Sequence, residues 1–128
     1  FNATDARRIE RLLRDLPDLL HRGDAEGASL LHGDLWSGNA HALADGSIAA
    51  IDPSAYYGHR EVDLAMAQLF GGFPPAFHDA YEDEWPLAAA GLNSRRATYQ
   101  LYYLLVHVNL FGGSYVSSCR TALAEAGA

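Results

Sequence analysis

The residues best suited to chemistry lie in one short polar segment, residues 32–39, and just beyond it. The segment reads His-Gly-Asp-Leu-Trp-Ser-Gly-Asn, and Asp52 follows at the end of the next apolar run. Its polarity and its glycines are typical of a loop and not of a core element. Because Asp34 and Asn39 are separated by a glycine-bearing stretch, both side chains can turn into one cavity.

The sequence after this loop predicts a β-hairpin. Asp-Gly at residues 45–46 separates two short apolar runs, which is a strong hairpin signal. The start of one antiparallel strand lies beside the end of its partner, so Asn39 and Asp52 should be neighbours. A carboxylate and an amide oxygen together suit Mg²⁺, a hard ion that prefers oxygen ligands. Asp34 is then free to orient a substrate hydroxyl.

These three residues match the arrangement used for phosphoryl transfer in protein-kinase-like enzymes. There a loop Asp acts as the base, and a loop Asn and a later Asp hold the metal ions. The loop pattern His-x-Asp-Leu-x-x-x-Asn is present, with Gly33 where protein kinases favour Arg, and Asp52 is followed by Pro53 instead of Phe-Gly. Each residue alone could be a plain turn residue. Their combined spacing favours catalysis and metal binding.

Composition excludes several other classes of function. The chain has 128 residues, enough for one domain with one core. It carries 9 basic and 16 acidic residues, a net charge of −7, which argues against a nucleic-acid partner. No apolar run approaches the roughly 20 residues of a membrane span, and no secretory signal is visible. The single Cys119 cannot form an internal disulfide, so we expect a cytoplasmic protein.

The hydrophobic pattern predicts an α+β fold that is mostly helical, with the hairpin packed on four to five helices. A first helix over residues 5–22 has Asp5 as a candidate N-cap and Pro17 as a kink or a break. A short strand is expected at residues 29–31 and a loop at residues 53–60. The later helices are predicted from Glu61 to Phe70, after Pro74-Pro75, from Asn93 or Ser94 to Phe111, and over residues 114–125.

Longer stretches of the chain closely resemble the fructosamine/ketosamine-3-kinase family. The similarity runs from about residue 30 to residue 120 and is carried by residues 31–39, 52–66, 69–77 and the Tyr-rich helix that ends at residues 110–113. The segments Trp-Ser-Gly-Asn and Tyr-Tyr-Gly-His-Arg-Glu are specific to the family. The core His-Gly-Asp alone is typical of any kinase-like fold, including the aminoglycoside phosphotransferases and choline kinases.

The resemblance implies a two-lobed kinase that uses ATP and Mg²⁺ to phosphorylate the sugar O3 of fructosamines and ribulosamines, a protein-deglycation reaction. Residues 1–128 match its C-terminal, catalytic lobe. Asp34 would be the catalytic base, and Asn39 and Asp52 would hold Mg²⁺ on the ATP. The chain has no Gly-x-Gly-x-x-Gly motif and no lysine, so the N-terminal nucleotide-binding lobe is expected to be absent from it.

Two aromatic side chains are candidates for substrate binding. Trp36 is either a packing aromatic or a platform for the sugar or its amine substituent, and the resemblance favours the platform. His107, on the long helix, either faces a ligand or is a satisfied core group. The substrate would be a small-molecule ketosamine or another glycated amine.

Other polar residues are expected to support the loop. In kinase-like folds, the residue at the place of His32 hydrogen-bonds backbone near the metal site, and that at the place of Asp63 tethers the loop backbone. For Asp63 the alternative is a charge that favours a helix N-terminus. His59, Arg60 and Glu61 either shape the loop or reach substrate, and the sequence does not decide between the two.

Two further readings stay open at this stage. One is a different small-molecule kinase, of the aminoglycoside or choline kinase type. The other is an inactive, lobe-only binding module, which the missing N-terminal lobe suggests. Loss of that lobe would uncover apolar surface, so we expect the isolated chain to associate, with a homodimer as one outcome.

Overall fold

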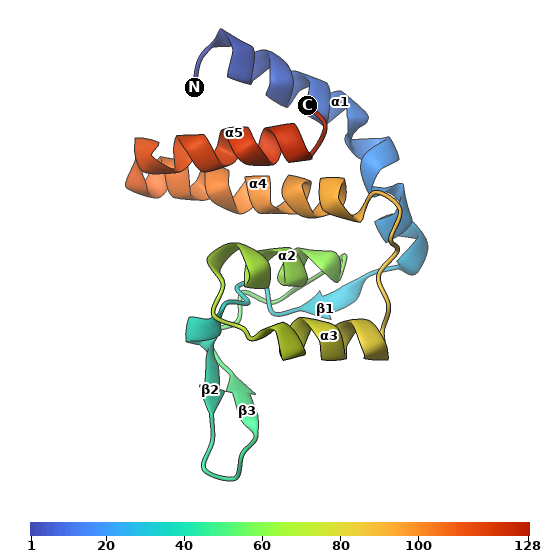
Figure 1. Ribbon diagram of the computed structural model, residues 1–128, viewed down its shortest axis with the longest axis vertical. Coiled ribbons are helices and arrows are strands. Elements are labelled where there is room, and N and C mark those ends of the chain that lie inside the picture. Colours follow the sequence, from blue (N-terminus) through green and yellow to red (C-terminus); the bar gives the residue numbers. More distant parts are fainter.

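The computed structural model describes the backbone of residues 1–128 and the side chains of all residues except 22–24. The fold is mostly helical, with two small antiparallel sheets (Figure 1). The α-helices are α1 (Ala3–Glu26), α2 (Glu61–Phe70), α3 (Pro75–Glu84), α4 (Leu92–Phe111) and α5 (Val116–Glu125). The strands are β1 (Ser29–Leu31), β2 (Ala40–Ala42), β3 (Ile48–Ala50) and β4 (Tyr56–Gly58), and 3₁₀ turns cover Ser37–Asn39 and Gly113–Tyr115.

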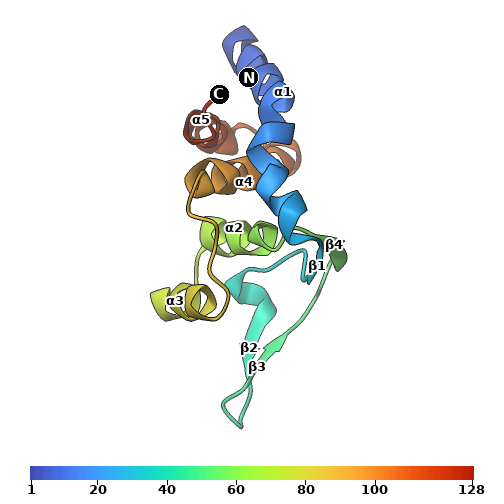
Figure 2. The same cartoon turned by 90° about the vertical axis from the view of Figure 1, so that its right-hand side faces the viewer.

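The helices form a stack in which α4 lies between α5 and α2, with α3 beyond α2 (Figures 1 and 2). Helix α1 runs along one side of this stack towards β1 and β4, as Figure 2 shows. The main core lies where α1, α4 and α5 meet and consists of Leu12, Ala97, Leu101, Leu104, Cys119, Ala122, Leu123 and Ala126. Burial raises the pKa of the Cys119 thiol, which keeps it protonated and unreactive.

Helix α1 begins with a reciprocal cap. The Asn2 side chain accepts hydrogen bonds from the amides of Thr4 and Asp5, and the Asp5 carboxylate accepts one from the Asn2 amide. The N-cap is therefore Asn2, and the prediction of Asp5 as the N-cap was wrong, although Asp5 belongs to the same reciprocal capping motif. Asp5 instead pairs with Arg120 of α5, whose hydrogen bonds lower the pKa of Asp5 to about 2. Pro17 does not split the helix, which continues to Glu26 and bends along its length (Figure 1).

The two sheets are each a single antiparallel pair. β2 pairs with β3 around the Asp-Gly turn, with Ala40 opposite Ala50, which confirms the predicted hairpin. β1 pairs with β4, with Leu31 opposite Tyr56. The prediction of a plain loop over residues 53–60 was therefore wrong. A three-residue strand has no internal period to reveal it, and its partner lies far away in sequence.

The β2–β3 hairpin projects away from the helices (Figure 1), so the expectation that it packs on them was wrong. Its apolar side chains Leu43 and Ile48 are 49% and 66% exposed. The alternation of the hairpin makes only a narrow strip of small side chains, mostly alanine, and therefore gives the helices little apolar surface to bury.

The helix boundaries follow glycine and proline. α2 ends at Gly71, which has a φ of 67°, and α3 has Pro75 at its first position, both as predicted. α4 begins at Leu92 behind Gly91, a left-handed residue, so neither Asn93 nor Ser94 is its cap. The last helix starts with a 3₁₀ turn before α5.

Candidate active site

The loop between β1 and β2 is fixed to the helices by Asp63 in the first turn of α2. Its carboxylate accepts hydrogen bonds from two successive backbone amides, those of His32 at 2.7 Å and Gly33 at 2.9 Å. Gly33 has a φ of 81°, and a Cβ at this position would overlap the carbonyl oxygen of Ser54. The loop therefore needs glycine here, both for its backbone conformation and for this close approach.

His32 ties the loop to the strand that leads to Asp52. Its Nε2 lies 2.8 Å from the carbonyl oxygen of Ile51, and its Nδ1 lies 3.3 Å from the backbone amide of Asp34. A carbonyl can only accept and an amide can only donate, so the neutral ring carries its proton on Nε2. Both ring nitrogens contact backbone.

Asp34 and Asn39 form a hydrogen-bonded pair across the loop. The Asn39 amide nitrogen donates to the backbone oxygen of Asp34 at 2.9 Å and to its carboxylate Oδ2 at 3.0 Å. Asn39 is 6% exposed, so this contact is sheltered from water. The amide thereby fixes the direction of the Asp34 carboxylate, and among the described interactions nothing engages the Asn39 side-chain oxygen, which can therefore accept a further partner.

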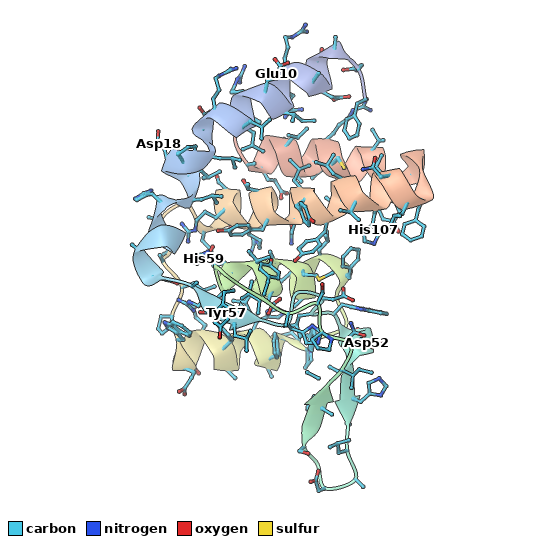
Figure 3. The ribbon with its side chains drawn as sticks, turned by 180° about the vertical axis from the view of Figure 1, so that it is seen from behind. Glu10, Asp18, Asp52, Tyr57, His59 and His107 are labelled. Atoms are coloured by element: carbon cyan, nitrogen blue, oxygen red, sulfur yellow. The ribbon has the colours of Figure 1, made fainter. Side chains whose placement is uncertain are left out.

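Asp52 lies at the root of the hairpin (Figure 3). The amide of Ile51 donates to the carbonyl of Asn39 at 2.9 Å, so Asp52 follows the residue that pairs with Asn39. Among the residues with described side chains, Asp52 is the only non-glycine with a positive φ, at 50°. Asp adopts this left-handed conformation more readily than most residues, and such residues are common at functional sites.

A cavity of about 380 Å³ opens beside Asp34. It is lined by Asp34, Trp36, Met66, Phe70 and His107. Trp36 is 41% exposed, and its ring lies so close to Gly38 that a Cβ there would overlap it. The Trp-Ser-Gly sequence thus lets the indole fold back over its own loop, at a place where Trp36 lines the cavity. Met66 and Phe70 were missed as lining residues, because their helical spacing is also that of ordinary core residues.

His107 enters this cavity from α4. Its Nδ1 donates to the backbone oxygen of Tyr103 at 2.8 Å, which leaves Nε2 for other partners. The imidazole is surrounded by aromatic rings, with that of Phe70 at a centroid distance of 4.7 Å and that of Tyr115 at 5.1 Å. Figure 3 shows His107 and Asp52 on the same side of the molecule, with His59 on the opposite side.

A buried tyrosine, Tyr103 of α4, lies near Tyr56 and near Asp63, the residue that holds the loop. Burial raises the pKa of its hydroxyl, and the neighbouring Tyr56 and Asp63 raise it further. Tyr103 is 8% exposed, so it remains a neutral phenol beside the carboxylate that holds the loop.

The donor atoms near the loop fit Mg²⁺ better than a softer ion. They are carboxylate and amide oxygens from Asp52 and Asn39, and the Asn39 oxygen is left open by the geometry described above. Among the described side chains, no group of three or more His, Cys, Asp or Glu forms a complete metal cage. A two-ligand protein site suits Mg²⁺, which keeps several waters and takes further oxygens from substrate phosphates.

A second cavity, of about 230 Å³, lies between α2, α3 and α4. It is lined by none of the predicted site residues, Asp34, Asn39, Asp52, Trp36, His107, His32 and Asp63.

Across the described residues, no helix is long and apolar enough to cross a membrane.

Comparison with known proteins gives one consistent result. The family model described as "Fructosamine kinase" matches residues 2–126. A "Probable ketoamine kinase" of Enterococcus faecium is 56% identical over 88 residues, which are 69% of this chain and 31% of that protein. One from Staphylococcus aureus is 41% identical over 118 residues, 92% of this chain and 40% of that protein.

A solved structure agrees with this. The crystal structure of a "putative fructosamine-3-kinase" from Thermobifida fusca superposes with a TM-score of 0.83 and 41% identity, over 98% of this chain and 43% of that one. The chain spans about a third of the length of the first curated relatives that it matches. A family model that covers almost every residue, with relatives of this identity, is decisive: the chain belongs to the fructosamine kinase family.

Proposed function

We propose that this chain is the C-terminal, catalytic lobe of an ATP-dependent kinase that phosphorylates the sugar hydroxyl of ketosamines, at O3 of fructosamines or ribulosamines. The N-terminal, nucleotide-binding lobe would come from outside residues 1–128. The observation that carries the proposal is the hydrogen bond between the Asn39 amide and Asp34 Oδ2. It joins the candidate base to a candidate metal ligand within one loop.

Asp34 acts on the hydroxyl that attacks the phosphate. With Oδ2 engaged by Asn39, Oδ1 is the oxygen that accepts the hydroxyl proton and aligns its lone pair. The loop must hold this oxygen in place to within a fraction of an ångström, because positioning contributes a large share of phosphoryl-transfer catalysis. Asp63 and His32 supply that support through the loop backbone.

Asn39 and Asp52 would hold Mg²⁺ on the ATP phosphates. When bound, the ion supplies charge neutralisation for the transferred phosphoryl group. Asn39 contributes a neutral oxygen and Asp52 a charged one. The same Asn39 side chain orients Asp34, so the nucleotide side and the sugar side of the reaction share one residue.

The sugar would enter the cavity beside Asp34. Its volume of about 380 Å³ is within the range of small-molecule sites, and its wall combines apolar, aromatic and polar groups. Trp36 offers a flat face for the sugar or its amine, and Nε2 of His107 offers a hydrogen-bond partner for a hydroxyl.

The test is a substrate panel with the full-length protein, ATP and Mg²⁺. We expect phosphate on O3 of a fructosyl-amine or ribulosyl-amine, identified by mass spectrometry and ³¹P NMR, and none on an aminoglycoside or choline. Phosphorylation of an aminoglycoside with no turnover of either ketosamine would contradict the proposed substrate class. Absence of any phosphoryl transfer would contradict the enzyme assignment.

One observation favours a second candidate, a lobe-only binding module. Leu43 and Ile48 of the hairpin, and Leu110 and Phe111 at the end of α4, are each between 49% and 68% exposed, so large apolar side chains meet solvent at two places on the chain. In this reading the chain associates through these side chains, for example as a homodimer, and performs no chemistry. Light scattering on residues 1–128 together with the panel above separates the two candidates.

A further inference from the structure

Three successive residues that the sequence leaves unassigned, His59, Arg60 and Glu61, precede and begin α2. The structure directs each of them to other elements of the fold and none into the cavity beside Asp34. Together they fix the start of α2 on several sides, two residues before Asp63.

Arg60 makes the most contacts of the three. It is 4% exposed and donates two hydrogen bonds to Glu26, at 2.9 and 3.2 Å, across to the last residue of α1. It also donates to the backbone oxygens of Trp85 and Pro86, at 2.7 and 2.8 Å, and its guanidinium lies 4.2 Å from the centroid of the Trp85 ring. Arginine suits this position because its planar fork can bond and stack at once.

Glu61 and His59 reach α4. Glu61 forms a two-bond ion pair with Arg95, at 2.7 and 2.9 Å, in which the side chains are 3% and 1% exposed. His59 lies 2.9 Å from the hydroxyl of Tyr99 and 3.2 Å from Glu26. Hydrogen bonds from Arg60 hold the pKa of Glu26 below its usual range, so Glu26 is ionised and binds both neighbours as a carboxylate.

The Glu26–Arg60 pair joins the end of α1 to the start of α2, the two segments that hold the Asp34 loop. Glu26 ends α1 and is separated by only two residues from β1, the strand that enters the loop. Arg60 lies directly ahead of the turn of α2 that carries Asp63. Between these points, β1 pairs with β4, and Asp63 holds the amides of His32 and Gly33. The Glu26–Arg60 ion pair is therefore one of three successive sets of contacts, with the β1–β4 pairing and the Asp63 hydrogen bonds, that connect α1 and α2 to the loop.

We propose that Glu26 and Arg60 are positioning residues for Asp34: by fixing the end of α1 to the start of α2, they keep Asp63 on the loop backbone and the Asp34 carboxylate in its reactive direction. The catalytic part of this inference rests on the proposed function. The structural part, that the Glu26–Arg60 ion pair keeps the loop ordered, is independent of the proposed function.

The chain offers a matched control at the other end of the same helix. Asp5 of α1 pairs with Arg120 of α5 at 2.9 Å, so it is also a carboxylate that anchors α1 through an arginine. It has no contact with β1, α2 or the loop among the described interactions. Asp5→Asn and Glu26→Gln therefore remove equivalent charges at the two ends of one helix.

The first experiment is amide hydrogen exchange on the full-length protein, followed in the peptide that covers residues 29–35. We expect Glu26→Gln to speed exchange of the His32 and Gly33 amides by about tenfold, because the local opening that exposes them becomes easier. Asp5→Asn should change it by less than about twofold, even where it lowers the melting temperature equally. Equal effects of the two variants would overturn the proposal. If Glu26→Gln does not fold, Arg60→Lys replaces it, since lysine keeps the charge but cannot bond and stack at once.

The second experiment measures kinetics in the full-length protein. We expect Glu26→Gln to lower kcat for the ketosamine about tenfold with KM for ATP nearly unchanged, and Asp5→Asn to leave both unchanged in the folded protein. A fall in kcat shared by both variants would reduce Glu26 to a general stability role and overturn the proposal. If the wild-type protein phosphorylates no ketosamine, the proposed function fails, and the exchange result still decides whether the ion pair orders the loop.

Discussion

The loop around Asp34 and the start of α2 that holds it are built in opposite ways. The loop relies on backbone turns and on one glycine with a left-handed conformation, and its candidate side chains Asp34 and Trp36 are partly exposed, whereas Asn39 is buried. The start of α2 relies on side chains: Arg60 and Glu61 are 4% and 3% exposed, and each has a bidentate partner. The loop presents the candidate catalytic groups, and the start of α2 holds the loop in place.

The difference teaches where sequence change should affect activity alone and where it should affect the fold. Groups that meet substrate must be accessible, so they contribute little to burial and can be replaced without loss of stability. Buried ion pairs are costly to desolvate, and removing one partner leaves an uncompensated charge. The predictions below test this division, beginning with the largest expected effect.

The largest effect is expected from the chain as it stands. Residues 1–128 alone should show no measurable kinase activity, because the chain has no lysine and no Gly-x-Gly-x-x-Gly loop with which to hold ATP phosphates. The assay couples ADP release to a spectroscopic readout, with a fructosyl-amine as substrate. Turnover within about tenfold of the full-length protein would show that this lobe alone positions the nucleotide, against the reasoning from phosphoryl-transfer enzymes.

The metal ligands should separate by charge. In the full-length protein, Asp52→Ala should weaken Mg²⁺-dependent ATP binding by roughly two orders of magnitude, and Asn39→Ala by about tenfold, because only Asp52 brings a negative charge to the ion. Calorimetry with and without Mg²⁺ measures this. Asp45→Ala, which removes an exposed carboxylate at the tip of the same hairpin, is the control. Equal losses of sugar and nucleotide binding would mean that the variant disrupts the whole site.

The buried pair at the start of α2 should dominate stability. Arg95→Met should lower the free energy of unfolding by about 3–5 kcal/mol, because Glu61 is left charged and buried. The double variant Arg95→Met/Glu61→Leu should recover much of that loss, and the exposed Arg14→Met should change stability by less than about 0.5 kcal/mol. Urea unfolding of residues 1–128 checks all three. A double variant no more stable than the single one would contradict this account of the pair.

A smaller effect is expected at Gly33. Gly33→Ala should cost about 1–3 kcal/mol, because alanine at a φ of 81° is strained and its Cβ meets the Ser54 carbonyl. Since Ser54 must shift, the loop moves and kcat in the full-length protein falls with stability. Gly46→Ala, at a φ of 85° with open space around it, isolates the strain alone. Equal kcat values for the two variants would show that the approach of Ser54 to the loop does not matter for activity.

Much of this fold could be predicted because its signals are local. Asp-Gly fixed the hairpin turn, and glycine and proline marked the bounds of α2 and α3. Strand β4 and the true cap at Asn2 could not be assigned in this way. Strand β4 depends on pairing with β1, which lies far away in sequence. The cap depends on reciprocal hydrogen bonds between Asn2 and Asp5, and both residue types are equally suited to the N-cap position.

The candidate site could be proposed for a similar reason, because its residues are close in sequence. Contacts between residues far apart in the sequence could not be predicted. The types and spacing of Asp34, Asn39 and Asp52 pointed to one candidate site, and the hairpin register brought Asn39 beside the strand that leads to Asp52. No local pattern shows that Met66 and Phe70 line the same cavity. Nor does one show that Arg60 reaches Glu26 at the far end of α1, because such contacts are set by helix packing.

The most direct test of the central claim is the Asp34→Asn variant of the full-length protein, assayed with ATP, Mg²⁺ and a fructosyl-amine. Asparagine keeps the shape of the side chain but cannot accept the hydroxyl proton, so kcat should fall by about 10²–10⁴-fold while ATP affinity and melting temperature stay near the wild-type values. Turnover close to that of the wild type, in a folded variant that still binds ATP, would contradict the assignment of Asp34 as the catalytic base.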